Sequence, residues 1–139
     1  MMLPELPLIA RAQGQGNRTA ILSSEGEFTY RQLLDSSAHV AACLLDGAGD
    51  LRERRVAFLI PPGFEYAAVQ WGIWRAGGIA VPLCVSHPRS ELEYVILDAD
   101  ADTVVAHPAF EDILGSIARE HDRRFLMTAG HPQDRKSVV

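Results

Sequence analysis

The sequence contains one lysine, Lys136, and two cysteines, Cys43 and Cys84, among its 139 residues. The cysteines lie 41 positions apart and no Cys-x-x-Cys pair occurs, which argues against a disulfide framework and against a structural zinc site. Isolated cysteines are typical of a reducing compartment, so we expect the chain to be cytoplasmic.

The sequence has no excess of positive charge. It carries 13 basic and 18 acidic side chains, for a formal net charge of −5. The two halves are alike, with 6 basic and 8 acidic groups in residues 1–70 and 7 and 10 in residues 71–139. Nucleic acids and anionic membrane surfaces attract basic faces, so we expect neither as a partner.

No long apolar run is present. The most membrane-like window, residues 67–86, contains Arg75 and is interrupted by Gly77, Gly78 and Pro82. Because a charged side chain at the bilayer centre is costly, we predict no membrane span and interpret this window as a buried helix that leads into a buried strand. Residues 1–10 lack the basic start of a secretory signal.

Motifs that cradle phosphate or activate a nucleophile are missing. No Gly-x-x-x-x-Gly-Lys-Ser/Thr loop and no Gly-x-Ser-x-Gly elbow occurs, and the glycine pairs at 14–16 and 47–49 do not complete Gly-x-Gly-x-x-Gly. Asp98, Asp100 and Asp102 resemble the start of a calcium loop. Thr103 stands where that loop needs glycine and Ala109 where it needs a bidentate glutamate, so we interpret the segment as a solvated corner.

Three histidines, His87, His107 and His131, each precede a proline and are predicted to be turn residues. Cys84 lies just after a predicted strand, and His87 follows three positions later. A thiol-based redox site at Cys84 therefore stays open as an alternative, although a buried apolar role fits better. By motifs alone, we assign no catalytic, cofactor-binding or metal-binding residue.

The first third of the chain predicts a hairpin and one long helix. Residues 1–17 read as a lead-in with one helical turn, and two short strands at 19–22 and 27–29 flank a glycine-containing turn. Thr29 and Gln32 have the spacing of a capping box, which predicts that a helix begins there and runs to Gly47. Its predicted buried stripe consists of Leu33, Ser37, Val40, Ala41, Leu44 and Leu45.

From residue 55 onward, short apolar runs alternate with amphipathic segments. Strands are predicted at 55–60, 79–83, 103–106 and 124–127, with helices at 64–76, after Pro88, and around 110–117. Trp71 and Trp74 are predicted to lie on the core side of the first of these helices, and Ile113 on that of the last. The fold class is therefore α/β: a hairpin and helix followed by β-α-β units that form a mainly parallel, three-layer sheet. We expect a lead-in at 1–17, the α/β portion at 18–127 and a polar tail at 128–139.

The order of several sequence pieces resembles the N-terminal part of the adenylate-forming superfamily. The pieces are Arg18-Thr-Ala-Ile, Phe28-Thr-Tyr-x-x-Leu33, Arg55-Val-Ala-Phe, Trp74-Arg-Ala-Gly-Gly-Ile-Ala-Val-Pro-Leu83 and Glu91-Leu-Glu-Tyr-Val-Ile-x-Asp98. Further pieces are similar to the branch of acyl-CoA synthetase family member 3, associated with malonyl-CoA and methylmalonyl-CoA synthesis: Asp50-Leu-Arg-Glu-Arg-Arg-Val, Gln70-Trp-x-x-Trp74 and His87-Pro-x-x-x-Leu-Glu-Tyr-Val-Ile.

This resemblance implies an ATP-dependent acid–CoA ligase, in which a carboxylate and ATP form an acyl-adenylate that coenzyme A converts to a thioester. ATP, magnesium and CoA are implied for the full-length family member. The family's phosphate loop, ribose-binding aspartate and catalytic lysine follow the matched segment in relatives, so no site residue is carried over to this chain.

The segment is accordingly expected to be a scaffold that is inactive alone. Its expected partner is the remainder of the ligase large domain, or a second copy bound through exposed apolar surface. The alternative is a self-sufficient α/β interaction module with a polar surface and no catalysis.

Overall fold

A computed structural model of the chain describes residues 5–129. It divides into two compact units, Met1–Arg52 with Pro62–Gly78 and Glu53–Pro61 with Ile79–Val139, which are described separately. His131, Lys136 and most of the expected polar tail lie outside the described residues.

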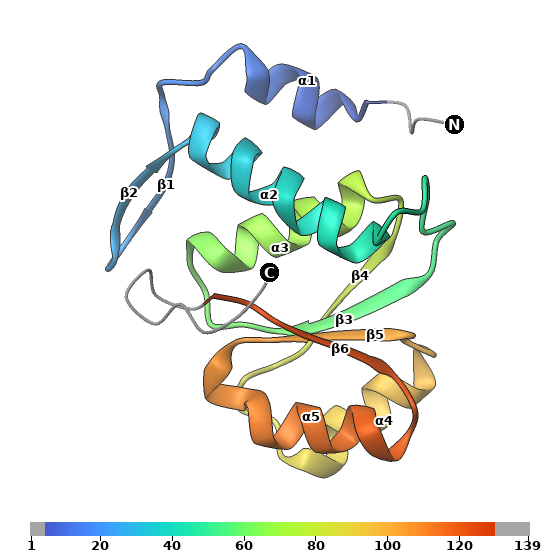
Figure 1. The fold of residues 1–139 in the computed structure, drawn as a ribbon. Helices are drawn as coiled ribbons and strands as arrows, with labels where there is room; N and C mark the ends of the chain where they lie inside the picture. The colour runs from blue at the N-terminus through green and yellow to red at the C-terminus, as the bar shows by residue number, and fades with distance from the viewer. Residues whose placement is uncertain (1–4, 130–139) are drawn as a thin grey trace. The chain divides into compact units, whose positions relative to one another are not determined.

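The first unit contains three helices and a hairpin, α1 (Pro7–Gln13), β1 (Thr19–Ser23), β2 (Gly26–Thr29), α2 (Tyr30–Leu45) and α3 (Phe64–Arg75) (Figure 1). The expected lead-in thus includes a helix longer than the single turn predicted, and this helix buries Ile9 and Ala12. The hairpin is antiparallel as predicted, with Ser23 opposite Gly26 at the turn. Gly26 has a φ of 128°, a conformation that favours glycine.

The predicted capping box is confirmed at the start of α2. The Gln32 N–H donates to Thr29 Oγ1 at 3.2 Å, and the Thr29 N–H donates to Gln32 Oε1 at 2.7 Å. These bonds satisfy two amides that a helix start leaves without intrahelical partners. The predicted stripe is also buried, apart from Leu45, which is half-buried. The helix ends where Asp46 adopts a left-handed conformation with φ 47°.

The prediction for α3 was wrong about its buried face. Trp71 is only half-buried and Trp74 is 37% exposed, and the buried residues of α3 are instead Ala68, Val69, Gly72 and Ile73. Gly72 explains the difference, because a Cβ at this position would lie 2.5 Å from Val40 Cγ1 of α2. The two helices approach too closely for a large side chain, so the face with the small residues is the packed one and Trp74 lies on the flank.

Arg75 joins the same two helices through its guanidinium. Its Nη1 donates to the Leu34 carbonyl at 2.8 Å and to Ser37 Oγ at 3.0 Å. Ser37 is fully buried, and its own hydroxyl donates to the Leu34 carbonyl at 3.1 Å. Arg75 therefore pairs with buried polar atoms of α2, which explains a charged residue inside the apolar window of the sequence.

The second unit is built on one parallel sheet. Its elements are β3 (Arg55–Leu59), β4 (Ile79–Pro82), α4 (Arg89–Asp98), β5 (Thr103–Ala106), the 3₁₀ helix η1 (Pro108–Phe110), α5 (Glu111–Glu120) and β6 (Arg124–Met127). The strand order is β4-β3-β5-β6 and every pairing is parallel. The predicted α/β class, parallel sheet and strand positions are confirmed. Pro82 is the last residue of β4, as predicted for a proline at a strand end.

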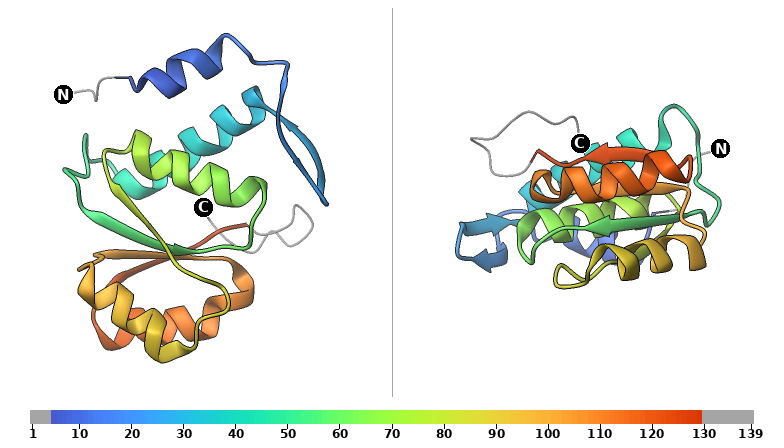
Figure 2. Two further views of the ribbon diagram at one scale, coloured as in Figure 1. Left: turned by 180° about the vertical axis from the view of Figure 1, so that it is seen from behind. Right: turned by 90° about the horizontal axis from the view of Figure 1, so that it is seen from below.

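Helices α4 and α5 cover one face of this sheet, as the two views of Figure 2 show. The core on this face combines strand residues with Leu92 and Ile96 of α4 and Leu114 and Ile117 of α5. The strand residues are Ala57, Leu59, Val104 and Ala106. The alternate residues Val56, Phe58 and Val105 are also buried, which explains why β3 and β5 read as continuous apolar runs.

Ile113 was wrongly placed in the core, since it is 40% exposed, while Gly115 and Ala118 are buried. The prediction treated residues 110–117 as one α-helix. A 3₁₀ turn ends at Phe110, and within α5 the buried stripe is centred on Leu114 and Ala118, which leaves Ile113 at its margin. Among the described residues, no helix is long and apolar enough to cross a membrane.

Two of the three aspartates that resembled a calcium loop, Asp100 and Asp102, are bonded to arginines. Arg123 Nη1 donates to Asp100 Oδ1 at 2.7 Å, and Arg54 Nη1 lies 3.4 Å from Asp102 Oδ2. Asp100 has a φ of 50°, a left-handed conformation that aspartate and asparagine tolerate. The hydrogen bond and positive charge of Arg123 lower the pKa of the Asp100 carboxyl. The segment is a helix–strand corner, as the sequence analysis interpreted it.

We predict that Gly72→Ala destabilises the protein by about 1–3 kcal/mol, because the added methyl group overpacks the α2–α3 contact. The clash should exceed the gain of about 1 kcal/mol that alanine normally gives over glycine in a helix. Urea unfolding followed by circular dichroism measures the difference. The double variant Gly72→Ala/Val40→Ala should recover part of the loss.

Gly115→Ala in α5 is the matched control. Its Cβ would lie 3.3 Å from the flexible end of Arg119 and 3.6 Å from Phe125, so the cost should be small. A Gly72→Ala variant as stable as the unchanged protein would contradict the packing argument.

We also predict an acid-dependent contribution from Asp100. The pKa of the Asp100 carboxyl is lower in the folded protein than in the unfolded chain, where it is about 3.9. The ionised carboxylate therefore stabilises the fold fully above that unfolded-state pKa. This stabilisation is lost as the pH falls through the folded-state pKa. The stability difference between the protein and Asp100→Asn, which preserves the left-handed preference, should therefore shrink below about pH 4. Carboxyl NMR titration should show the Asp100 pKa rising in Arg123→Gln. An unchanged pKa in that variant would contradict the assignment.

Candidate functional site

The carboxyl ends of the strands form one edge of the parallel sheet, which is where ligands bind in open α/β folds. The hydrogen-bond ladder continues past the strand ends, with Leu83 N–H donating to the Phe58 carbonyl at 2.9 Å and Thr128 N–H to the Ala106 carbonyl at 2.9 Å. This edge therefore carries Cys84 and the histidine after β5. Thr128 is 1% exposed, although the sequence analysis placed it at the start of the polar tail.

Cys84 is exposed and lies in a tight turn at this edge. Its Sγ lies 3.1 Å from Ser86 Oγ. Hydrogen bonds from the Ser86 side chain, the Ser86 backbone and the His87 backbone lower the pKa of the Cys84 thiol, against smaller opposing effects of desolvation and Glu91. The exposure contradicts the buried apolar role that the sequence analysis favoured.

His87 and His107 do not supply a base to this thiol. His87 Nε2 lies 3.4 Å from Glu91 Oε2, an i,i+4 pair on the first turn of α4. His107 caps η1, where its Nδ1 accepts the Ala109 N–H at 3.0 Å. Both side chains therefore have local roles at the turns where they were predicted, and in residues 5–129 no histidine ring is hydrogen-bonded to Cys84 Sγ.

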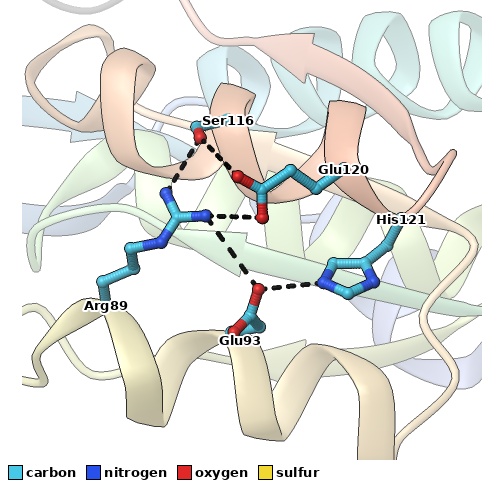
Figure 3. Close-up of polar contacts among 5 residues, drawn as sticks. All are labelled: Arg89, Glu93, Ser116, Glu120 and His121. Carbon is cyan, nitrogen blue, oxygen red and sulfur yellow. Dashed lines mark hydrogen bonds and ion pairs between the residues drawn. The ribbon is translucent and has the colours of Figure 1, made fainter.

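Five polar residues meet where α4 and α5 lie side by side, and we call them the α4–α5 cluster: Arg89, Glu93, Ser116, Glu120 and His121 (Figure 3). Arg89 donates from Nη1 to Ser116 Oγ at 2.9 Å and from Nη2 to Glu120 Oε2 at 2.8 Å. On the other side, His121 Nε2 lies 2.9 Å from Glu93 Oε2, and Arg89 Nη2 lies 4.0 Å from the same carboxylate.

The α4–α5 cluster has the donor types of a metal site. One ligand atom from each of Glu93, Glu120 and His121 lies within 4.8 Å of the others. However, the Arg89 guanidinium contacts both carboxylates and already supplies the positive charge. A divalent cation would have to displace that arginine from its bonds to Glu120 and Ser116, so the geometry favours an ion-pair network that joins two helices.

Sequence reasoning missed this cluster. Arg89 and Glu93 are visible as an i,i+4 pair, but their partners lie 27 and 31 positions from Arg89. No local pattern predicts which face of α5 meets α4, so only the tertiary structure brings these residues together.

Three of the described helices carry an acidic residue in their first turn. A helix N-terminus can bind phosphate, but the first turns of α3, α4 and α5 carry Glu65, Glu91 and Glu111, and the α2 amides are capped by Thr29. A Cβ at Gly63 would lie 3.4 Å from Glu25 Oε1, which adds another negative charge at the start of α3. These acids would repel a polyphosphate.

We predict that Arg89→Met, which keeps the apolar stem, lowers the free energy of unfolding by about 0.5–1.5 kcal/mol. The substitution leaves Glu120 and Ser116 without their cationic donor. The loss of stability should be smaller in high salt, because the ion pair is partly exposed. Denaturant unfolding at two salt concentrations measures it.

The control is Arg119→Met, an exposed arginine of α5, which should change stability little at either salt concentration. Adding Zn²⁺ to the unchanged protein should not raise its melting temperature. A clear rise that disappears in His121→Ala would instead support the metal interpretation.

Comparison with known proteins identifies relatives over nearly the whole chain. Residues 8–137 match the family described as AMP-binding enzyme. The human mitochondrial malonate–CoA ligase ACSF3 is 39% identical over 118 residues, which cover 82% of this chain and 20% of that protein. The malonate–CoA ligase of Arabidopsis thaliana is 27% identical over 130 residues, or 84% of this chain and 21% of that protein.

Solved structures agree with the sequence relatives. The crystal structure of apo MatB from Rhodopseudomonas palustris superposes with a TM-score of 0.75 and 27% identity, covering 94% of this chain and 26% of that one. The same enzyme has also been solved bound to ATP. This chain spans about a fifth to a quarter of the length of these proteins. Since the family match covers well over half of its residues, the chain belongs to the AMP-binding enzyme family.

Proposed function

We propose that this chain is the N-terminal scaffold segment of an ATP-dependent acid–CoA ligase. Its acid substrate is a small dicarboxylate of the malonate or methylmalonate type, with a fatty acid as the alternative. The observation that carries the proposal is the 39% identity to the human malonate–CoA ligase over 118 residues. The fold it shares with MatB supports the same conclusion.

In the proposed enzyme, a carboxylate attacks the α-phosphate of ATP to give an acyl-adenylate and pyrophosphate, and the CoA thiol then displaces AMP. The residues described here contribute a buried parallel sheet and the helices around it. They place acidic side chains at three helix N-termini and carry no lysine within 5–129. The segment alone is therefore expected to be inactive.

The proposed partner is the remainder of the ligase large domain, added at the β6 side of the sheet. β4 and β6 are the two outer strands. The Leu83 N–H donates to the Phe58 carbonyl of β3. Because the N–H groups of successive strand residues point to opposite edges of the strand, the nitrogen of Pro82 points away from β3. Proline has no N–H there, so it cannot donate a hydrogen bond to an added strand. Proline protects an edge strand against further pairing, so β6 is the better acceptor.

We propose a reducing compartment for the chain, because its two cysteines, Cys43 and Cys84, lie 41 positions apart and form no Cys-x-x-Cys pair. The cytoplasm is the expected location, and the name of the human relative makes the mitochondrion the competing one. Fractionation of cells that express the protein, with an antibody against this segment, separates the two.

A chimera tests the proposed function. The full chain replaces the matched first quarter of MatB, and the product is assayed with malonate, ATP, Mg²⁺ and CoA. We expect malonyl-CoA and pyrophosphate to form at a rate within about tenfold of MatB, a loss of about 1.4 kcal/mol or less. The 139-residue chain alone should form neither product.

The matched control is the same chimera with Gly72→Trp, which disrupts the α2–α3 contact and should abolish activity. A soluble, folded chimera without activity would contradict the scaffold proposal. If the chimera is inactive and analytical ultracentrifugation also shows that the isolated chain is a monomer, the alternative of a self-sufficient interaction module is favoured.

A further inference from the structure

A groove of about 700 Å³ lies within the first unit, and nothing in the proposed ligase function uses it. One part of its lining is apolar or aromatic, from Leu8 and Ala12 of α1 and Tyr30 of α2. The volume falls within the range of about 300–1,000 Å³ that is typical of small-molecule sites.

The rest of the lining is polar and cationic, with Arg11, Gln15, Arg18 and Thr19. Arg18 Nη1 donates to Gln15 Oε1 at 3.0 Å, which leaves its charge uncompensated. None of the described residues that line the groove is acidic. Glu5, the acidic residue at the start of α1, accepts a hydrogen bond from Gln13 instead.

Three arginines of the second unit have carboxylate partners, unlike these two. Arg54, Arg89 and Arg123 each form an ion pair with a carboxylate. In the part of the chain that the structure describes, neither Arg11 nor Arg18 has a carboxylate within 4.0 Å.

Backbone hydrogen bonds fix the loop that carries Arg18. The Arg18 N–H donates to the Gln15 carbonyl at 2.8 Å, and the Arg18 carbonyl accepts the Tyr30 N–H at 3.0 Å. The Arg31 N–H donates to the Gly16 carbonyl at 3.0 Å. The loop from Gln15 to Arg18 is thus fixed to the first turn of α2, so the arginine and the Tyr30 ring are presented together without a ligand.

We propose that this groove binds a phosphate monoester with an apolar or aromatic body. A phosphate monoester carries a charge of about −1.5 to −2 at neutral pH, which matches two guanidinium groups. Arginine binds phosphate oxygens through paired N–H groups, and the Thr19 and Tyr30 hydroxyls can donate beside them. Leu8, Ala12 and the Tyr30 ring supply the surface for the apolar body.

The test is a calorimetric titration of the full chain with phenyl phosphate, compared with inorganic phosphate and with phenol. We expect phenyl phosphate to bind at least tenfold more tightly than either fragment. The variant Arg11→Gln/Arg18→Gln should weaken its binding at least tenfold, and Tyr30→Leu should reduce the advantage of phenyl phosphate over inorganic phosphate.

The control is Arg52→Gln/Arg119→Gln, which removes two exposed arginines outside the groove and the same total charge. It should leave the affinity within about twofold. Equal weakening by both double variants would mean a nonspecific charge effect and would overturn the proposal, as would the absence of binding. Circular dichroism confirms that each variant is folded, and because the titration requires no ligase activity, its outcome is independent of the chimera experiment.

Discussion

The second unit depends on the parallel pairing of β3 with β5. Both strands are flanked on each side by another strand, and Phe58 and Val105 are fully buried where they pair. This pairing aligns the carboxyl ends of all four strands on one edge and sets the face on which α4 and α5 pack. A parallel sheet with both faces buried requires continuous apolar strands, and that constraint accounts for the sequence pattern of the unit.

The arginines discussed above have different partners in the two units. In the second, arginines and carboxylates pair across elements that are distant in the sequence, as in the α4–α5 cluster and at Asp100. In the first, Arg75 is satisfied by a carbonyl and a hydroxyl of α2, and Arg11 and Arg18 face an open groove. The ion pairs of the second unit thus hold helices and the helix–strand corner in place. In the groove of the first unit, the arginine side chains are available to a ligand.

The features of the described residues that resembled active sites each have a local explanation. The aspartates after α4 are bonded to arginines, His107 caps η1, and the metal-like donors Glu93, Glu120 and His121 surround a guanidinium. This distribution fits a segment whose role is architectural, as the proposed function requires. Cys84 differs, because it is exposed with a lowered pKa, but its contacts are with Ser86 and backbone amides.

The sequence by itself determined the elements whose signals are local. The capping box at Thr29, the hairpin turn and the apolar runs of β3 to β6 all depend on neighbours within a few residues, so their positions were predictable, as was the superfamily from the order of its motifs. Only the tertiary structure decided which faces meet. Trp74 lies outside the core because Gly72 allows α2 to approach closely. Ile113 lies at the margin of the buried stripe because that stripe is centred on Leu114 and Ala118. Arg89 contacts Glu120 because two helices pack on one sheet. Such contacts join residues tens of positions apart, and no periodicity within a single element specifies them.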